Sequence, residues 1–97
     1  MAKLDRQNRL LIPKCILEAS KTDFSKEVRI YIKDDELFLD NPSNDNKMIR
    51  CWGIVHLDRN RRFCVKKIVR KVFNINEETD ISCFLLNGRI TYKKESF

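Results

Sequence analysis

A six-residue pattern that occurs twice constrains this chain most. Residues 4–9 are LDRQNR and residues 57–62 are LDRNRR, so both begin with Leu-Asp-Arg and end with Arg. Asp5 and Asp58 are 53 positions apart (58 − 5), and this offset aligns the residues that follow without a gap. A fixed internal offset is typical of a repeated structural unit. The sequence therefore predicts two copies of one fold within 97 residues.

The residues that follow the hexapeptide share apolar character rather than identity. Apart from Lys14 and its counterpart Lys67, the aligned positions are mostly aliphatic in both copies. The aligned pairs include Ile12 with Val65, Ile16 with Val69, Val28 with Ile81, Ile32 with Leu85, and Leu37 with Ile90. Cores tolerate exchange among apolar residues of similar volume. A polar hexapeptide that keeps its identity is therefore under a constraint other than core packing.

Each copy has the pattern of two short strands, a helix and a hairpin. The first strands are expected at 2–4 and 49–57, and the second strands at 9–12 and 62–65, after the hexapeptide. Pro13 suits the first turn of a helix from about residue 14, because its missing N–H costs nothing there. In the second copy the spacing predicts a helix whose apolar face carries Ile68, Val69, Val72 and Phe73.

Two hairpins are expected after the helices. Period-two alternation predicts half-buried strands at 28–33, with Arg29, Tyr31 and Lys33 facing outward, and at 81–85. Asn87-Gly88 is a strong hairpin signal, because both residues accept the positive φ of a type I′ turn. Its aligned partner, Asp34-Asp35, is a weaker version of the same turn.

The chain is predicted to be one compact domain of mixed α+β class, mostly β. Its element order is β-β-α-β-β, twice, with a first repeat over 1–40, a polar linker over 41–48 and a second repeat over 49–94. A hydrophobic fraction of 42% and a charged fraction of 35% suit a soluble globular domain. No apolar run approaches the roughly 18 residues of a membrane span, and no secretory signal is expected.

Charge is unevenly distributed. The formal net charge is +6 and the pI is about 9.3, which favours a polyanionic partner. The segment from Leu57 to Lys71 has a single acidic residue, Asp58. Its basic residues are Arg59, Arg61, Arg62, Lys66, Lys67, Arg70 and Lys71. A second stretch is purely acidic: Asp34, Asp35, Glu36, Asp40 and Asp45. We expect separate positive and negative regions, against the alternative of an ordinary solvated surface.

Metal binding and catalysis are not expected. The cysteines are Cys15, Cys51, Cys64 and Cys83, and they form no C-x-x-C pair. Three of them align with Ile68, Leu11 and Ile30, so we expect them to be small core residues. One His, two Gly and no phosphate-binding loop leave too few groups for an active site. We therefore expect neither an enzyme nor a cofactor.

The string LDRQNRLLIPK, followed by a short helix and a hairpin, resembles the AbrB/MazE/SpoVT family of bacterial swapped-hairpin DNA-binding domains. The family signature is an acidic residue, two variable residues, Gly-Arg and an aliphatic run that ends in Ile-Pro. Two units in one chain resemble the MraZ arrangement, whose Asp-x-x-x-Arg spacing is met by Asp5 with Arg9 and by Asp58 with Arg62. The resemblance implies a pseudo-dimeric, swapped-hairpin barrel that binds duplex DNA.

The resemblance also implies a DNA-binding surface in which both turns lie on one face. The expected DNA-binding residues are Arg6, Arg9, Lys14, Arg59, Arg61, Arg62, Lys66 and Lys67. Arginine suits this role, since its planar fork bonds phosphate or the guanine edge bidentately. Asp5 and Asp58 are expected to orient the turns through bonds to backbone N–H groups or to the following Arg. For the three lysines, a purely solvated role remains an alternative.

The second copy departs from the family pattern more than the first. The Gly that precedes Arg in the family is Asn8 in the first copy, which tolerates a left-handed backbone, and Arg61 in the second, which tolerates it less. Pro13 is replaced by Lys66. Whether both repeats contact DNA equally stays open.

The expected function is a DNA-binding transcriptional regulator, cytoplasmic and associated with the nucleoid. The alternative is the antitoxin, or a protein-interaction module, of a MazE-like toxin–antitoxin pair. Such antitoxins usually carry a C-terminal tail, and none is expected after the last strand. A structured RNA is a further alternative partner, and self-association into a dimer or a ring stays open. No membrane partner is expected.

Overall fold

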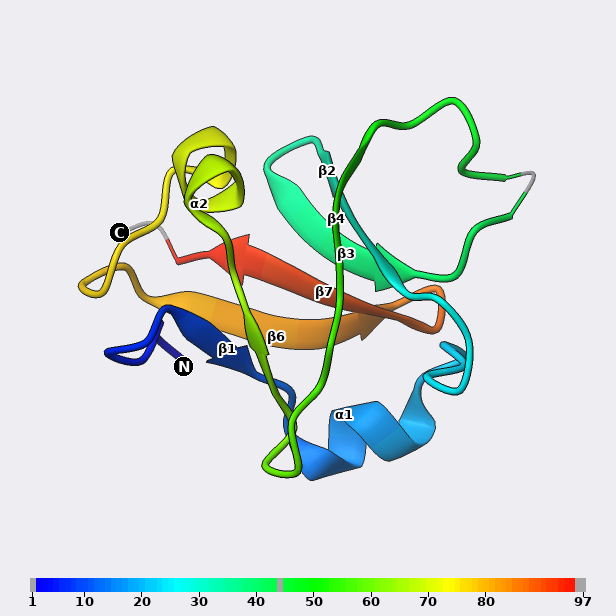
Figure 1. Ribbon diagram of the computed structural model, residues 1–97, viewed down its shortest axis with the longest axis horizontal. Helices are drawn as coiled ribbons and strands as arrows, with labels where there is room; N and C mark the ends of the chain where they lie inside the picture. The colour runs from blue at the N-terminus through cyan, green and yellow to red at the C-terminus, as the bar shows by residue number, and fades with distance from the viewer. Residues whose placement is uncertain (1, 44, 96–97) are drawn as a thin grey trace.

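The computed structural model describes residues 2–43 and 45–95 (Figure 1). The described chain forms seven strands and two short helices, an α+β fold in which strands predominate. The elements are β1 (Arg9–Leu11), α1 (Lys14–Ala19), β2 (Arg29–Lys33), β3 (Glu36–Asp40), β4 (Cys51–Ile54), β5 (Arg62–Cys64), α2 (Lys67–Phe73), β6 (Ile81–Leu86) and β7 (Arg89–Lys94).

The strands form two separate antiparallel sheets. β1 pairs with β5 alone, and the larger sheet has the order β4-β2-β3-β7-β6. The expectation of a closed barrel is therefore wrong. Closure requires two neighbours for every strand, whereas β1 and β5 are three residues long and each has one neighbour. The larger sheet stays open, with β4 and β6 as its outer strands.

Strand pairing joins residues 2–40 to residues 49–94. β1 pairs with β5, β2 with β4, and β3 with β7. Two further bonds occupy equivalent positions: Val55 N–H donates to Val28 O (2.8 Å), and Ala2 N–H donates to Ile81 O (2.7 Å). The two bonds are equivalent because the offset of 53 aligns Ala2 with Val55 and Val28 with Ile81. Each part of the chain thus supplies strands to the sheets of the other.

The core lies between β1–β5 and one face of the larger sheet. Leu10 and Phe63 face each other across β1–β5, and both are buried. The Phe63 ring packs edge-on against Tyr92 of β7, with centroids 6.0 Å apart. The Tyr92 hydroxyl donates to the Leu11 carbonyl (2.8 Å), which gives this buried polar group a partner. These contacts fix the small sheet on the large one.

The first strand of each copy is shorter than expected. At 2–4 the structure has a single bridge, Ala2 to Ile81, and the strand expected over 49–57 is β4, Cys51–Ile54. The expected apolar face of α2 is also narrower. Val69 and Phe73 are buried, but Ile68 and Val72 are 51% and 41% exposed. A helix of seven residues packs one i, i+4 row against the core, and the adjacent row faces solvent.

The segment expected as a linker packs on the larger sheet. Asn46 is buried, and its side-chain Oδ1 accepts a bond from the Tyr31 hydroxyl (3.3 Å). Tyr31 is only 1% exposed and stacks on Phe38, with ring centroids 5.3 Å apart. The expectation that Tyr31 faces outward is therefore wrong, because β2 is covered on both faces at this position.

Two of the cysteines expected in the core are exposed. Cys15 lies in α1 and Cys64 ends β5, and the side chains of both face solvent. Cys83 is partly buried on β6, and burial raises the pKa of its thiol to about 11. Alignment with an aliphatic residue did not indicate burial for Cys15, because the aligned residue, Ile68, is itself exposed.

Both predicted hairpin turns are confirmed. Asp34 and Asp35 join β2 to β3 with φ of 52° and 63°, and Asn87 and Gly88 join β6 to β7 with φ of 54° and 80°. Two consecutive positive φ values define the type I′ loop, whose twist matches that of paired strands.

Replacing Gly88 with Ala is expected to lower the free energy of unfolding by about 1 kcal/mol. At φ +80° a Cβ is strained, and it would lie 2.6 Å from the Lys21 Cδ atom. Urea denaturation of both proteins measures the difference. Gly53→Ala is the matched control, because its Cβ would meet only Ile30 Cδ1 at an ordinary 3.7 Å. Equal stabilities for the two variants would contradict the strain at Gly88.

Candidate nucleic-acid interface

The two hexapeptide turns have the same hydrogen bonds between the aspartate side chain and the backbone. Asp5 Oδ1 accepts bonds from the backbone N–H groups of Gln7 and Arg9, both at 2.9 Å. Asp58 Oδ1 accepts the equivalent bonds from Asn60 (2.8 Å) and Arg62 (3.0 Å). A backbone pair also closes each turn, between Asp5 and Arg9 and between Asp58 and Arg62. Each aspartate therefore holds its turn as an Asx-type cap.

The residue before each second arginine has a left-handed backbone. Asn8 has φ of 60° and Arg61 has φ of 61°. Asparagine accepts this conformation readily, whereas for arginine it costs roughly 1–2 kcal/mol. Arg61 Nε donates to the Ile12 carbonyl (3.2 Å), and the Arg61 carbonyl accepts the Ile12 N–H (2.8 Å). These two bonds to the neighbouring strand offset part of the strain.

Four charged side chains meet between the turns. Arg9 Nε donates to Asp5 Oδ2 (2.8 Å), and Arg9 Nη1 donates to Asp58 Oδ2 (3.2 Å). Arg62 Nε lies 3.9 Å from Asp5 Oδ2, beyond hydrogen-bond distance. Arg9 is thus held by two carboxylates. Among the described residues, the Arg62 guanidinium has no carboxylate at hydrogen-bond distance, so its donors are available to a ligand.

These bonds lower the pKa of both aspartates. Burial acts to raise the pKa of the Asp5 carboxyl, but the bonds from the backbone and side chain of Arg9 and from Gln7 outweigh it. For Asp58 the backbone bond from Arg62 is the largest cause of the lowered pKa. The bonds form to the charged carboxylate, so they favour ionisation. Both groups therefore stabilise the folded turns while ionised.

Acid is expected to weaken the fold through these two carboxylates. Their folded-state pKa values lie below the ordinary value of 3.8, so their contribution to stability is present above that pH. It is lost as pH falls from about 4 through the lowered values. Urea unfolding between pH 7 and pH 3 should therefore show a flatter acid limb for Asp5→Asn/Asp58→Asn than for the wild type. Parallel pH profiles would contradict the role of these bonds.

The backbones of the two turns lie apart, although the Arg9 side chain of the first turn reaches Asp58 of the second. Each turn precedes its strand, and β1 and β5 are antiparallel, so the turns lie at opposite ends of the small sheet (Figure 1). Arg6 and Arg59 are exposed, one in each of the two turns. Arg9 and Arg62 extend between them, and both line a shallow hollow with Asp5 and Arg6.

The three predicted lysines lie at the helix starts and are exposed. Lys14 begins α1, and its Nζ is 4.0 Å from Glu18 Oε1. Lys66 directly precedes α2 and Lys67 begins it. Arg70 belongs to the basic run but is not among the residues expected to bind DNA. In the structure Arg70 Nη1 donates to the Val65 carbonyl (2.8 Å), so it supports the connection between β5 and α2.

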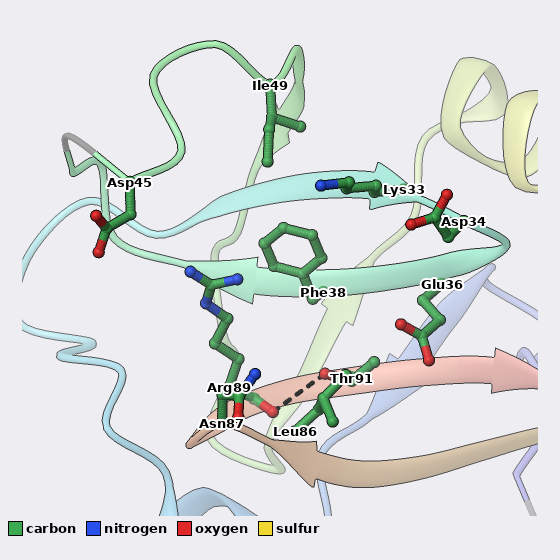
Figure 2. A pocket seen from close by; sticks show the side chains of 10 residues that line it. All are labelled: Lys33, Asp34, Glu36, Phe38, Asp45, Ile49, Leu86, Asn87, Arg89 and Thr91. Carbon is green, nitrogen blue, oxygen red and sulfur yellow. Dashed lines mark hydrogen bonds between the residues drawn. The ribbon is translucent and has the colours of Figure 1, made fainter.

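A hollow of about 230 Å³ lies on the opposite face of the larger sheet (Figure 2). Phe38 and Thr91 form its floor, and the side chains of Lys33, Asp34 and Glu36 lie around it. The Arg89 guanidinium at its rim is 3.1 Å from Asp40 Oδ2. Its acidic groups and its paired arginine make this hollow unsuitable for a polyanion. Basic groups without such pairing lie instead around β1–β5.

Comparison with protein-family models, curated proteins and solved structures gives no match for this chain. Across residues 2–43 and 45–95, no three His, Cys, Asp or Glu side chains are grouped as a metal site would need. No helix in the described chain has the length and apolar character to cross a membrane.

Proposed function

We propose that this protein is a duplex-DNA-binding transcriptional regulator of the AbrB-like type, which uses the surface around β1–β5. The observation that carries the proposal is the pair of Asp-x-x-x-Arg turns with matching hydrogen bonds. The bonds that hold the backbone of each turn do not involve the side chains of Arg6 or Arg59. The arginines at both tips, Arg6 and Arg59, are exposed and provide donors for a ligand.

The pairing of strands between the two parts of the chain supports a duplicated swapped-hairpin unit. In such a unit, each copy completes the sheets of the other, as β1–β5, β2–β4 and β3–β7 do here. We infer that one chain supplies both halves of a module that other members of this class build from two chains. The open larger sheet remains a departure from the barrel of the class.

The spacing and chemistry of the basic groups favour nucleic acid over a small anion. They extend along both ends of a small sheet rather than converging on one enclosed pocket. Arg6, Arg59, Lys66 and Lys67 are all exposed. Extended, exposed cations suit a repeating row of phosphates, which supplies most of the affinity of non-specific DNA binding.

Salt dependence tests this proposal. If about five phosphates are neutralised, log affinity should fall against log salt with a slope of about −4 to −5. Fluorescence anisotropy with a labelled duplex of random sequence, between about 50 and 200 mM salt, measures it. A structured RNA hairpin of equal length serves as the competing ligand. Absence of duplex binding, or tighter binding of the hairpin, would contradict the proposal.

A further inference from the structure

Each end of β1–β5 combines residues from both copies. The turn over 58–61 contacts the strand before α1, because Arg61 O accepts the Ile12 N–H at 2.8 Å. The turn over 5–8 contacts the strand before α2, because Asn8 O accepts the Val65 N–H at 2.8 Å. We call residues 58–61 with 12–18 the arginine end, and residues 5–8 with 65–71 the lysine end.

Because each end combines residues from both copies, the additional positive charge of the second copy is divided between the two ends. Residues 4–20 hold three basic and two acidic side chains, whereas residues 57–73 hold seven basic and one acidic. Four aligned positions account for the difference: Asn8 and Arg61, Pro13 and Lys66, Leu17 and Arg70, Glu18 and Lys71. The first of these adds its cation to the arginine end, and the other three add theirs to the lysine end.

The cations at the two ends differ in chemistry. At the arginine end the turn carries Arg59 and Arg61, and a planar arginine fork can bond a guanine edge bidentately. The Arg61 Nε donates to the Ile12 carbonyl, so Arg61 would use its two Nη groups. At the lysine end the turn carries Arg6, and the other exposed cations are Lys66, just before α2, and Lys67 and Lys71 in α2. A lysine ammonium acts as a point charge, which suits phosphate and carries little base information.

A pair of adjacent glutamates lies beside the turn at the lysine end. Glu77 and Glu78 line a hollow together with Asn8 and Arg70 at the lysine end. At the offset of 53 their counterparts are Phe24 and Ser25, which are uncharged. Negative charge beside the Asn8 turn opposes close approach of a phosphate or a base edge there. The aligned positions of the first copy carry no acidic side chain.

We propose, on the basis of the function proposed above, that the two ends engage DNA in different ways. The arginine end contacts base edges through Arg59 and Arg61, and the lysine end holds the phosphate backbone through Lys66 and Lys67. The protein then binds a non-palindromic site in one fixed orientation. A symmetric dimer of identical units cannot make this distinction, and the single chain with unequal copies can.

Directed cleavage of DNA tests the orientation. An iron–EDTA probe is attached either to Cys15 in α1 or, after Cys15→Ser, to the aligned position in α2 through Ile68→Cys. Both positions are exposed. Both proteins also carry Cys51→Ala and Cys64→Ser, and the Cys83 thiol stays protonated at neutral pH because its pKa is about 11. The DNA is the duplex recovered by selection from a random pool.

The expected result is one-sided cleavage. The probe in α1 should cut at one border of the site, and the probe in α2 should cut at the other border. Equal cutting at both borders by each probe would overturn the fixed orientation while leaving DNA binding intact. Recovery of no duplex from the pool would overturn the proposed function, and this inference with it. The two failures are therefore distinguishable.

Two exchanges between the copies test the division of roles. Arg61→Asn installs the residue found at Asn8 and suits a φ of 61°. Lys66→Pro installs the residue found at Pro13, and the backbone allows it, since φ and ψ are −65° and 159° at Lys66 and −56° and 141° at Pro13. Each variant therefore removes one cation with little backbone strain.

The two variants should fail in different ways. Arg61→Asn should reduce discrimination between the selected duplex and one with its arginine-end half-site scrambled, on the order of tenfold or more. Lys66→Pro should weaken the binding of both duplexes equally and reduce the slope of log affinity against log salt by about one. Equal losses on both duplexes for Arg61→Asn, or lost discrimination for Lys66→Pro, would contradict the assignment. Circular dichroism melting confirms that each variant is folded.

Discussion

Replacing Arg59 and Arg62 together with alanine is expected to lower affinity for duplex DNA by roughly 100-fold, since each lost arginine contact is worth about 1–3 kcal/mol. Arg59 is exposed at the tip of its turn, and the Arg62 guanidinium approaches Asp5 no closer than 3.9 Å. Both side chains are therefore available to a ligand. Fluorescence anisotropy with a labelled duplex measures the loss.

The matched control for this variant is Lys33→Ala/Lys93→Ala. It removes the same charge from exposed residues of β2 and β7. Lys33 borders the hollow on the opposite face of the larger sheet, and Lys93 shares the face of Thr91 because side chains alternate along a strand. The control should lose less than threefold in affinity at about 0.15 M salt, where the field of distant charges is screened. Equal losses for the two variants would show attraction by net charge alone.

Arg9 is unsuitable for the same experiment. Its guanidinium bonds both Asp5 and Asp58, so Arg9→Ala leaves two carboxylates near each other without their cation. A loss of DNA binding in that variant would mix the loss of a ligand contact with damage to the turns. The equivalent arginines of the two copies are thus not interchangeable as probes.

Phe63→Ala is expected to lower the free energy of unfolding by about 3–5 kcal/mol. The Phe63 side chain is 1% exposed, faces Leu10 across the small sheet and packs on Tyr92 of the larger one. Its removal leaves a cavity at the contact between the two sheets. Urea denaturation followed by circular dichroism measures the change.

The neighbouring residue provides the control for this cavity. Cys64→Ala alters an exposed position of the same strand and should change stability by no more than about 0.5 kcal/mol. A loss below about 1 kcal/mol for Phe63→Ala would contradict the packing of β1–β5 on the larger sheet.

Local patterns of the sequence predicted local structure well. The pairs Asn87-Gly88 and Asp34-Asp35 correctly predicted both hairpin turns, because the φ preference of these residues determines the loop type. Pro13 marked the start of α1 for a similar reason. Such signals depend on one or two residues and not on the rest of the chain.

Features that depend on distant segments were not predictable in the same way. Tyr31 occupies an outward position by alternation, but residues from the expected linker cover it. The positions of the turns at opposite ends of β1–β5 follow from antiparallel pairing between segments more than 50 residues apart, which no local pattern specifies. The division of positive charge between the arginine and lysine ends follows from the same pairing.

The most direct test of DNA binding through the paired turns is selection from a random duplex pool by the wild type and by Arg59→Ala/Arg62→Ala in parallel. The wild type is expected to enrich a defined motif over successive rounds, with the arginine-substituted protein enriching none. Enrichment of no motif by the wild type, or of the same motif to the same extent by both proteins, would contradict recognition of DNA by these turns.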